Sequence, residues 1–432
     1  MRSFIPSKIP VLLMLLSGLC LSVLAEGEQE AQKPKVEQAT GWSLSELIDA
    51  LKQNNPQLRS ASESARAVEL GISPAQALDN PTLSVAQDPL RNSPLNVNSS
   101  TGMAWGISQN FMWPGKKRLA GEVVKAQADL SKEQVNLLKL QLIGQLRTTW
   151  SNWQQTAIQI DLTKVQVQRL EQIKQITKIR YANNAAAYAD YINAQVAQAQ
   201  LETDLLGLQR QQKILEDQIS ALIGRKEPLK LKMAEVAVDQ AKTNLDGVEA
   251  KALDINPQVK ASQFVIESAR KSVELAELGK LPDLSVGVLA HSSSPPWGFS
   301  NNNSYGLNLG VTLPLYYGQK EKNLIDQAKA YLASTLENDE SLRQQVIFGV
   351  RSSYHQWTQS LDQLKLIEER VLKQAQIGYR LTLSAYSTGQ ASYTDLLNAF
   401  NALKTSEIQR EQSRSFAIQA KVALDVAVGL SE

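Results

Sequence analysis

The side chains that most often carry chemistry are few and far apart in this 432-residue chain. Its two histidines, His291 and His355, have no second ligand nearby at the spacing of a zinc site. The same isolation argues against a histidine-based catalytic triad, and the sequence has no glycine-rich phosphate loop. The adjacent carboxylates Glu368 and Glu369 fall in a predicted helix, where we expect them to be solvated. We therefore predict that the chain is not an enzyme and uses no metal or other cofactor.

The N-terminus has the pattern of a secretory signal peptide, which we place at residues 1–25. Arg2 and Lys8 give it a positive start, residues 9–24 are almost wholly apolar, and the segment ends with Ala25 at a cleavage-site position. The apolar core is shorter than the roughly 20 residues that a membrane-spanning helix needs. The segment therefore predicts export, with cleavage after Ala25.

Cys20 is the only cysteine and lies inside this segment, so the mature chain has neither disulfides nor thiolate ligands. Leu19 before it fits a bacterial lipidation site poorly, which argues against a lipid anchor. Residues 26–41 are rich in Glu, Gln and Lys and predict a disordered leader.

Composition excludes one class of partner and favours one kind of structure. The 45 basic and 43 acidic residues give a net charge of only +2, which argues against a nucleic-acid binder. A hydrophobic content of 43% with 6% aromatic residues is typical of long helices rich in Ala, Leu and Gln. No stretch after the signal is apolar for long enough to predict a membrane-spanning helix.

The chain is an internal duplication whose matching segments lie roughly 200 residues apart, a spacing that indicates two structural halves and not a solenoid. We place the first repeat at residues 42–224, the second at residues 248–430, and a linker at residues 225–247. The matching pairs are Asn55-Pro56 with Asn256-Pro257, Pro81-Thr82-Leu83 with Pro282-Asp283-Leu284, Arg147 to Trp153 with Arg351 to Trp357, Tyr188-Ala189-Asp190 with Tyr393-Thr394-Asp395, and Ile223-Gly224 with Val428-Gly429.

Long helices dominate each repeat. Apolar residues at mixed spacings of three and four predict helices at about residues 116–180 and 188–223, and again at about 320–384 and 391–429. Each pair is separated by a short polar break, so each repeat is expected to form an antiparallel helical hairpin that ends at a capping glycine, Gly224 or Gly429. Three tryptophans at matching places are expected to be buried between these helices: Trp150, Trp153 and Trp357.

Two short strands precede the long helices of each repeat, at about residues 82–88 and 102–112 and at about 283–291 and 305–314. In the last of them Tyr305, Leu307, Leu309, Val311 and Leu313 alternate with small or polar residues. Alternation of this kind over about ten residues is typical of a membrane β-barrel strand. The connecting loops are rich in Asn, Ser and Pro, as extracellular loops are. The alternative interpretation is a pair of hairpins that cap a soluble helical domain.

Four strands do not close a barrel, and open strand edges in lipid leave costly unpaired backbone groups. The chain must therefore combine its strands with those of other copies. About twelve strands, from three chains, enclose a pore, whereas about eight strands leave an interior filled with side chains.

These residues resemble the TolC-type outer-membrane efflux proteins of Gram-negative bacteria. The resemblance spans about residues 42–430 and includes the duplication, the Asn-Pro helix starts, and Pro114 and Pro314 after the second and fourth strands. It implies a mainly α fold with transmembrane β: a homotrimer whose twelve-stranded barrel lies in outer-membrane lipid and continues as a helical periplasmic tunnel. It also implies a periplasmic adaptor and an inner-membrane pump. The general pattern is most similar to the branch that serves resistance-nodulation-division (RND) pumps, which include heavy-metal exporters.

The resemblance further implies a gate at the tips of the helical hairpins. Tyr386, Gly389 and Asp395 match the tyrosine, the glycine and the first acid of the family's tip motif, whereas Asn398 replaces its second acid. Ala391 stands where some members have an arginine, so the resemblance does not supply the gate link that this arginine makes.

In the first repeat Asp190 matches the acidic residue, but the usual tip glycine is missing. Copies of Asp395 around a threefold axis would form a negative ring that attracts cations. Alternatively, such an aspartate simply stabilises a helix N-terminus. Tyr386 and Asn398 are further gate candidates, and Arg380 and Gly389 are candidates for contact with the adaptor.

Three functions remain open from the sequence. The first is a passive channel that exports small solutes, drugs or metal cations in a tripartite complex. The second is the outer-membrane duct of a type I protein secretion system. The third is a periplasmic coiled-coil scaffold without a pore.

Overall fold

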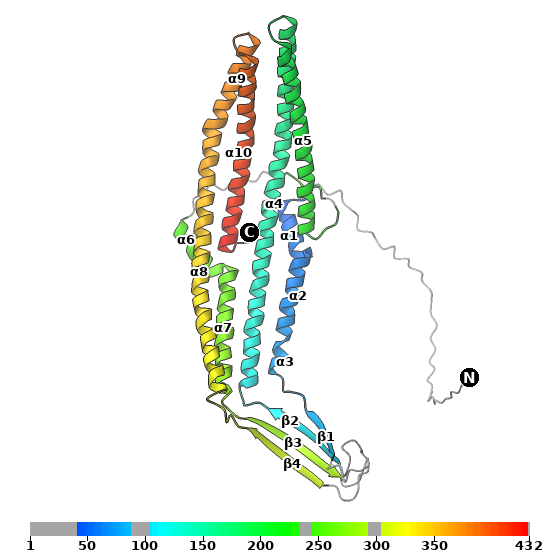
Figure 1. The fold of residues 1–432 in the computed structure, drawn as a ribbon, viewed down its shortest axis with the longest axis vertical. Coiled ribbons are helices and arrows are strands. Elements are labelled where there is room, and N and C mark those ends of the chain that lie inside the picture. The colour runs from blue at the N-terminus through cyan, green and yellow to red at the C-terminus, as the bar shows by residue number, and fades with distance from the viewer. Residues whose placement is uncertain are drawn as a thin grey trace, which may run out of the picture. The chain divides into compact units, whose positions relative to one another are not determined.

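The computed structural model describes residues 41–87, 103–227, 229–233, 238, 244–292 and 304–430. The predicted signal peptide and almost all of the predicted leader lie outside these residues, as do most of the two loops between paired strands. The described part is mainly helical with one small sheet (Figure 1), which confirms the predicted fold class.

The two repeats contain corresponding elements, except that a short third helix occurs only in the first and a π-helical turn divides the long helix of the second. The first consists of α1 (Leu44–Asn54), α2 (Pro56–Leu70), α3 (Ile72–Gln76), β1 (Thr82–Gln87), β2 (Met103–Phe111), α4 (Lys116–Ala182) and α5 (Tyr188–Leu222). The second consists of α6 (Leu245–Ile255), α7 (Pro257–Leu278), β3 (Asp283–Ser292), β4 (Ser304–Thr312), α8 (Glu321–Leu366), the π-helical turn η2 (Ile367–Leu372), α9 (Lys373–Ser387) and α10 (Tyr393–Val428).

An asparagine joins the beginning of one helix to the end of another in each repeat. The Asn55 side chain accepts a hydrogen bond from Leu58 N at 2.9 Å and donates one to Leu222 O at 2.7 Å, so it caps α2 and holds the end of α5. Asn256 does the same for α7 and α10, where its Nδ2 donates to Ala427 O at 2.9 Å. Both side chains are buried, and each satisfies backbone groups that helix ends leave unpaired.

The second long helix differs from the first at one place. We expected a continuous helix at residues 320–384, but η2 separates α8 from α9, whereas α4 runs for 67 residues without interruption. Across η2 the spacing between matching residues grows by one, from Trp153 and Trp357 to Tyr181 and Tyr386. A π-helical turn accommodates one extra residue within an α-helix, so η2 absorbs a single insertion in the second repeat.

The helices form a wall in which the repeats alternate. Toward the hairpin tips α5 packs along α4, α4 along α10, and α10 along α8, η2 and α9. Toward the sheet α2 packs along α4, α4 along α7, and α7 along α8. Every helix in the described residues is too short or too polar to span a lipid bilayer.

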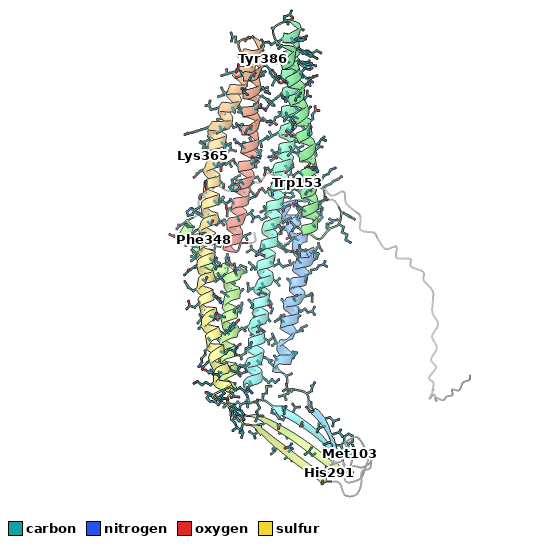
Figure 2. The ribbon with its side chains drawn as sticks, viewed as in Figure 1. Met103, Trp153, His291, Phe348, Lys365 and Tyr386 are labelled. Carbon is teal, nitrogen blue, oxygen red and sulfur yellow. The ribbon has the colours of Figure 1, made fainter. Side chains whose placement is uncertain are left out.

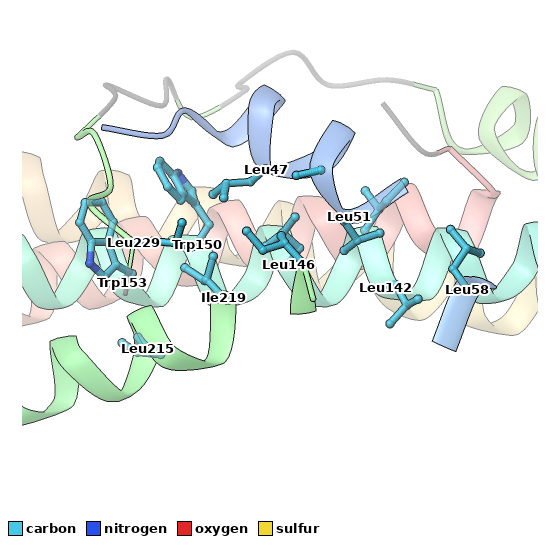
Figure 3. Packing of buried hydrophobic residues seen from close by; sticks show 13 residues of the cluster. Leu47, Leu51, Leu58, Leu142, Leu146, Trp150, Trp153, Leu215, Ile219 and Leu229 are labelled. Atoms are coloured by element: carbon cyan, nitrogen blue, oxygen red, sulfur yellow. The ribbon is translucent and has the colours of Figure 1, made fainter. Parts of the chain in front are cut away.

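Apolar clusters hold this wall together where the shorter helices meet the long ones. Trp150 and Trp153 lie in a cluster with Leu47, Leu51 and Ile219, which joins α1, α4 and α5 (Figure 3). Trp357 is the centre of a corresponding cluster in the second repeat, between α8 and α10. The predicted burial of the three tryptophans is thus confirmed.

Candidate functional site

The four strands form one antiparallel sheet in the order β1-β2-β3-β4. Its register places the apolar residues in rows that cross the sheet on one face: one row is Leu83, Ile107, Val288 and Leu307, and another contains Phe111, Leu284 and Val311. These side chains are exposed, Leu307 to 68%. The opposite face carries small and polar residues such as Ser84, Gly106, Gly287 and Asn308. A sheet that exposes an apolar face and a small, polar face suits a wall between lipid and water.

The sheet is open at both sides within one chain. β1 pairs only with β2 and β4 only with β3 among the described residues, so the outer edge of each has unpaired backbone groups. Such edges pair readily with another strand.

A buried lysine connects the sheet to the helical wall. Lys116, the first residue of α4, donates from Nζ to Asp283 Oδ1 at 2.8 Å and to Leu281 O at 2.9 Å. Asp283 Oδ1 also accepts from Trp113 N at 2.7 Å. The turn after β2 is therefore fixed to the beginning of β3, and the two repeats meet at this joint.

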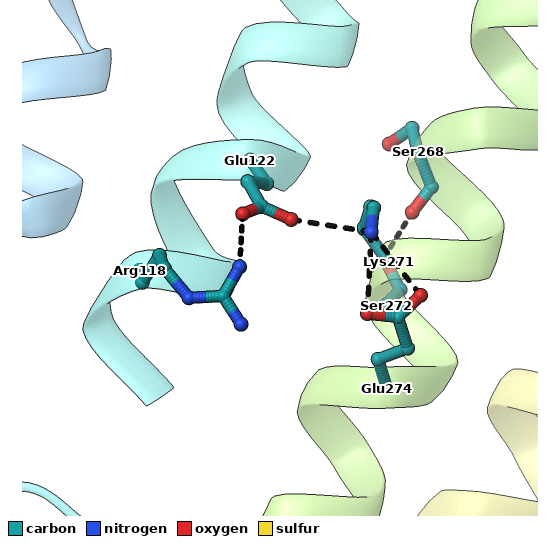
Figure 4. A network of polar contacts seen from close by, with 6 residues as sticks. All are labelled: Arg118, Glu122, Ser268, Lys271, Ser272 and Glu274. Carbon is teal, nitrogen blue, oxygen red and sulfur yellow. Dashed lines mark hydrogen bonds and ion pairs between the residues drawn. The ribbon is translucent and has the colours of Figure 1, made fainter. Parts of the chain in front are cut away.

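A second ionic network lies just above the joint (Figure 4). Lys271 on α7 lies 3.2 Å from Glu122 Oε2 on α4, and the Arg118 guanidinium contacts the other oxygen of Glu122. Lys271 also pairs with Glu274 on its own helix. The hydrogen bond from Lys271 and the charge of Arg118 hold the pKa of Glu122 below its ordinary value. The network therefore ties the long helix of the first repeat to the second repeat near the sheet.

The two hairpin tips have the same backbone conformation although their sequences differ. Gly389 has φ +85° and Asn184 has φ +58°, so both lie in the left-handed region. Asparagine is the residue that most often replaces glycine in this conformation. The turns also share a hydrogen bond from the following residue to the last helical turn: Gln390 N donates to Ala385 O, and Ala185 N to Arg180 O, each at 2.8 Å. The missing glycine in the first repeat therefore does not change the turn.

Tyr386 is buried against the first hairpin. Its hydroxyl donates to Thr177 Oγ1 on α4 at 3.1 Å, and the Arg180 guanidinium lies 4.4 Å from the centre of its ring. Arg180 also donates to Tyr386 O and, at 2.9 Å, to Ala185 O. Arg180 of the first tip thus binds the ring and the backbone of Tyr386 in the second tip, and it also binds Ala185 in its own turn.

Sequence analysis did not single out Thr177 or Arg180. The signal that points to Arg180 is its place in the last turn of α4, together with Ala391 at the family's arginine position in the other tip. The second hairpin has Ala391 in place of the arginine, and Arg180 of the first hairpin supplies a guanidinium at the second tip.

Asp395 caps the helix on which it lies. Its Oδ2 accepts hydrogen bonds from Ser392 N at 3.1 Å and Ser392 Oγ at 2.7 Å, and Ser392 Oγ accepts from Asp395 N. These bonds from Ser392 lower the pKa of Asp395 below its ordinary value. The side chain stays exposed, so the cap and a place on a pore surface are compatible.

Tyr393 is buried between the two tips, where the charge of Asp190 acts on it. Burial, the charge of Asp190 and the proximity of Tyr386 raise the pKa of Tyr393 to about 12. Tyr393 packs edge-on against Tyr386, with ring centres 6.3 Å apart. Of the predicted gate residues, Tyr386 thus contacts Tyr393, and Asp190 acts on Tyr393 through its charge. Asn398 lies exposed one turn beyond Asp395 on α10.

The remaining site candidates are exposed and separate. Arg380 lies on the surface of α9 and Gly389 in the second tip turn, where both are accessible to a partner. His291 lies on β3 and His355 on α8, and the described residues contain no group of three His, Cys, Asp or Glu side chains placed to hold a metal ion.

Comparison with known proteins agrees with this architecture. The chain is similar to toxin and drug export protein A of Aggregatibacter actinomycetemcomitans, with 23% identity over 88% of this chain and 85% of the relative. It is also similar to the pyoverdine export outer membrane protein OpmQ of Pseudomonas putida, with 20% identity over 89% and 85%.

Solved structures show the same fold. CusC superposes with a TM-score of 0.78 over 92% of this chain and 96% of its own, at 16% identity. The MtrE outer membrane channel of Neisseria gonorrhoeae, solved in an open state, superposes with a TM-score of 0.74 over 90% and 89%, at 17% identity.

The family profile described as outer membrane efflux protein matches residues 47–225 and 248–430, which is most of the chain. The match falls in two parts that correspond to the two repeats, and it agrees with the predicted TolC-type resemblance, efflux function and outer-membrane location. The chain therefore belongs to the outer membrane efflux protein family, whose members are channels of the Gram-negative outer membrane.

Proposed function

We propose that three copies of this chain form a passive export channel, with a barrel in outer-membrane lipid and a helical tunnel in the periplasm. The observation that carries this proposal is that the sheet and the helical wall are open at corresponding sides. β1 and α2 lie at one side of the chain's layers, and β4 and α8 at the other.

The contacts between the repeats indicate how these sides meet. Within the chain β2 of the first repeat pairs with β3 of the second, and α4 packs against α7 and α10. If the same step is applied once more, β4 meets β1 of the next copy, and the helix of α8 and α9 meets its α2 and α5. Identical interfaces that close in a ring give a symmetric oligomer, and three copies supply the roughly twelve strands that enclose a pore.

The partners follow from the direction of export. A passive channel needs a driven pump, so we assign an inner-membrane pump, of the RND type, and a periplasmic adaptor that contacts the hairpin tips at Arg380 and Gly389. Two relatives are named for the export of toxins and drugs and of pyoverdine. Drugs and pyoverdine are small solutes, and on these two words we assign small solutes as the substrate class of this chain, whereas the word toxin also fits the type I secretion alternative.

The gate is proposed at the tips, where the contacts between the hairpins of one chain converge. Tyr386 would hold the second tip against the first, with Asp190 beside it, while Asp395 and Asn398 would line the constriction. A ring of carboxylates favours cations and slows anions.

Membrane fractionation and channel recording test this proposal together. We expect the protein in the outer-membrane fraction as a trimer that dissociates on heating in detergent, and discrete conductance steps in planar bilayers. Recovery as a soluble periplasmic protein would instead support the scaffold. Co-purification with an ATPase-driven exporter and a protein substrate would support the type I secretion duct.

Two substitutions locate the wall and the gate. Leu309→Arg on the apolar face of the sheet is expected to cost about 2–4 kcal/mol and to reduce trimer yield, whereas Asn308→Arg on the opposite face serves as the matched control. Asp395→Ala is expected to weaken the block by multivalent cations in single-channel records. An unchanged block would remove Asp395 from the constriction.

A further inference from the structure

Phe348 is a large aromatic residue on the free side of the helical wall. It lies in the middle of α8, and 72% of its surface is exposed (Figure 2). By the duplication it matches Gly144 on α4, just as Arg351 matches Arg147 three residues later. The two repeats thus place a large aromatic residue and the smallest residue, glycine, at one structural position.

Gly144 shows what this position does inside the chain. A Cβ atom added to it would lie 2.6 Å from Val426 Cγ2, so the valine side chain of α10 occupies the space above the glycine. An ion pair next to it, between Arg147 and Asp425 at 3.2 Å, holds the two helices together. The contact of α4 with α10 therefore contains a small residue on α4 and a larger one on α10.

The residue that matches Val426 is Ala221 on α5. The match is fixed by the asparagine caps, since Asn55 binds Leu222 O as Asn256 binds Ala427 O. Ala221 lines a hollow of about 490 Å³ together with Asn55, Pro56 and Gln218. The α5 residue that corresponds to Val426 is thus the small Ala221, and the surface around it is recessed.

We propose that Phe348 of one copy packs on Ala221 of the next and fills this hollow. The contact repeats the step from α4 to α10, but the sizes are exchanged: glycine faces valine within the chain, and phenylalanine faces alanine between copies. Phenylalanine and alanine together are larger than glycine and valine, and the hollow beside Ala221 supplies the room that close packing of the larger pair requires. The inference rests on the proposed trimer and names the residues that join its subunits.

The hairpin tips supply a second contact in the same register. Thr177 donates to Ile173 O at 2.8 Å, which leaves its hydroxyl oxygen free to accept from Tyr386. Thr382 on α9 matches Thr177 and donates in the same way to Gly378 O, at 2.9 Å. Tyr181 matches Tyr386 and is 46% exposed, so Tyr181 of the next copy is placed to donate to Thr382.

A compensation experiment tests the size exchange. We expect Phe348→Gly and Ala221→Val each to lower trimer stability, the first through a cavity and the second through a clash with Phe348. Each should raise the protein concentration at which half of the trimer dissociates by at least about tenfold. The double variant recreates the glycine and valine pair of the interior, relieves the clash and should recover part of the loss. A double variant that is no better than the worse single variant would overturn the contact.

Photocrosslinking tests the same contact without removing it. p-Benzoylphenylalanine at position 348 is expected to give a covalent dimer in which the linked peptide contains Ala221, whereas the same amino acid at position 386 should crosslink only within one chain. Stable trimers in which position 348 crosslinks to a different helix would overturn the inference and leave the proposed trimer intact. A wild-type protein that does not form trimers would overturn both.

Discussion

Tyr181 and Tyr386 occupy the same position in the two hairpin tips, yet Tyr181 is 46% exposed and Tyr386 only 1%. Their turns have the same backbone conformation, and each tyrosine packs against a second one across its turn, Tyr188 or Tyr393. The difference arises from the neighbour, because α4 covers Tyr386 and no described element covers Tyr181 to the same extent. Equal local structure therefore gives unequal burial within a single chain, as expected if the proposed trimer covers Tyr181.

Removal of the buried ring should have the largest effect on this comparison. Tyr386→Ala deletes a fully buried aromatic side chain and is expected to destabilise the second tip by about 3–5 kcal/mol. Hydrogen exchange followed by mass spectrometry should show faster exchange in α9 and in the beginning of α10. Tyr181→Ala in monomeric, detergent-dissociated protein is the matched control, and an equal effect there would contradict the assigned difference in burial.

Arg180 is the residue that makes the contact between the tips specific. Arg180→Ala removes its hydrogen bonds to Tyr386 O and Ala185 O and its contact with the Tyr386 ring, and we expect a loss of about 1–2 kcal/mol. Arg180→Lys should restore little, because an ammonium lacks the planar group that binds two acceptors and stacks on a ring. Full recovery in Lys would show that charge alone holds the tips together. Single-channel conductance and the rate of hydrogen exchange at the hairpin tips measure the effect.

The helix caps give a smaller difference between the two tips. Ser392 caps α10, whereas Ala187, the N-cap residue of α5, makes no side-chain hydrogen bond to the helix. Ser392→Ala should cost about 1 kcal/mol, and Ala187→Ser should stabilise the first tip by a similar amount because Asp190 stands where it completes a capping box. The protease resistance of the two tips measures both effects. An Ala187→Ser variant as susceptible as the wild type would show that Asp190 is held elsewhere.

At neutral pH the smallest effect concerns the titration of Tyr393, because the phenol is then protonated in both the folded and the unfolded state. Its pKa of about 12 lies above the ordinary tyrosine value of about 10. The folded tip is therefore favoured below about pH 10, and this contribution is lost as the pH rises toward 12. Absorbance at 295 nm, compared with Tyr393→Phe, isolates the group. Asp190→Asn should lower its pKa, since the carboxylate disfavours a nearby phenolate, and an unchanged pKa would place Asp190 too far away.

Much of the fold could be predicted from the sequence because the long helices and the strands occur in both repeats, so each copy supports the assignment of the other. Strand alternation in Tyr305 to Val311 and the spacing of apolar residues along the long helices were sufficient for the mainly α fold with its small sheet. η2 could not be predicted from periodicity. Apolar residues in a helix recur at spacings of either three or four, so one extra residue leaves a pattern that still fits a continuous helix. The extra residue is visible only when the two repeats are compared.

The candidate site was predictable at the level of position and not of contact. Asp395 and Tyr386 were identified at the second tip, and the capping role considered for Asp395 is what the structure shows. The contacts of Tyr386 with Thr177 and Arg180 cross about 200 residues of sequence, and no local pattern connects such residues.

The π turn has a consequence for the symmetry of the proposed trimer. The return helices α5 and α10 span the same number of residues between the tip tyrosine and the terminal glycine, Tyr188 to Gly224 and Tyr393 to Gly429. The extra residue of η2 therefore changes the path of one helix and not the height of its hairpin. Six hairpins of equal height would alternate between an uninterrupted helix and one with a π turn, whose backbone hydrogen bonding is locally less regular. The trimer would then bend most easily at three places, one η2 in each chain, while the three α4 helices stay uninterrupted.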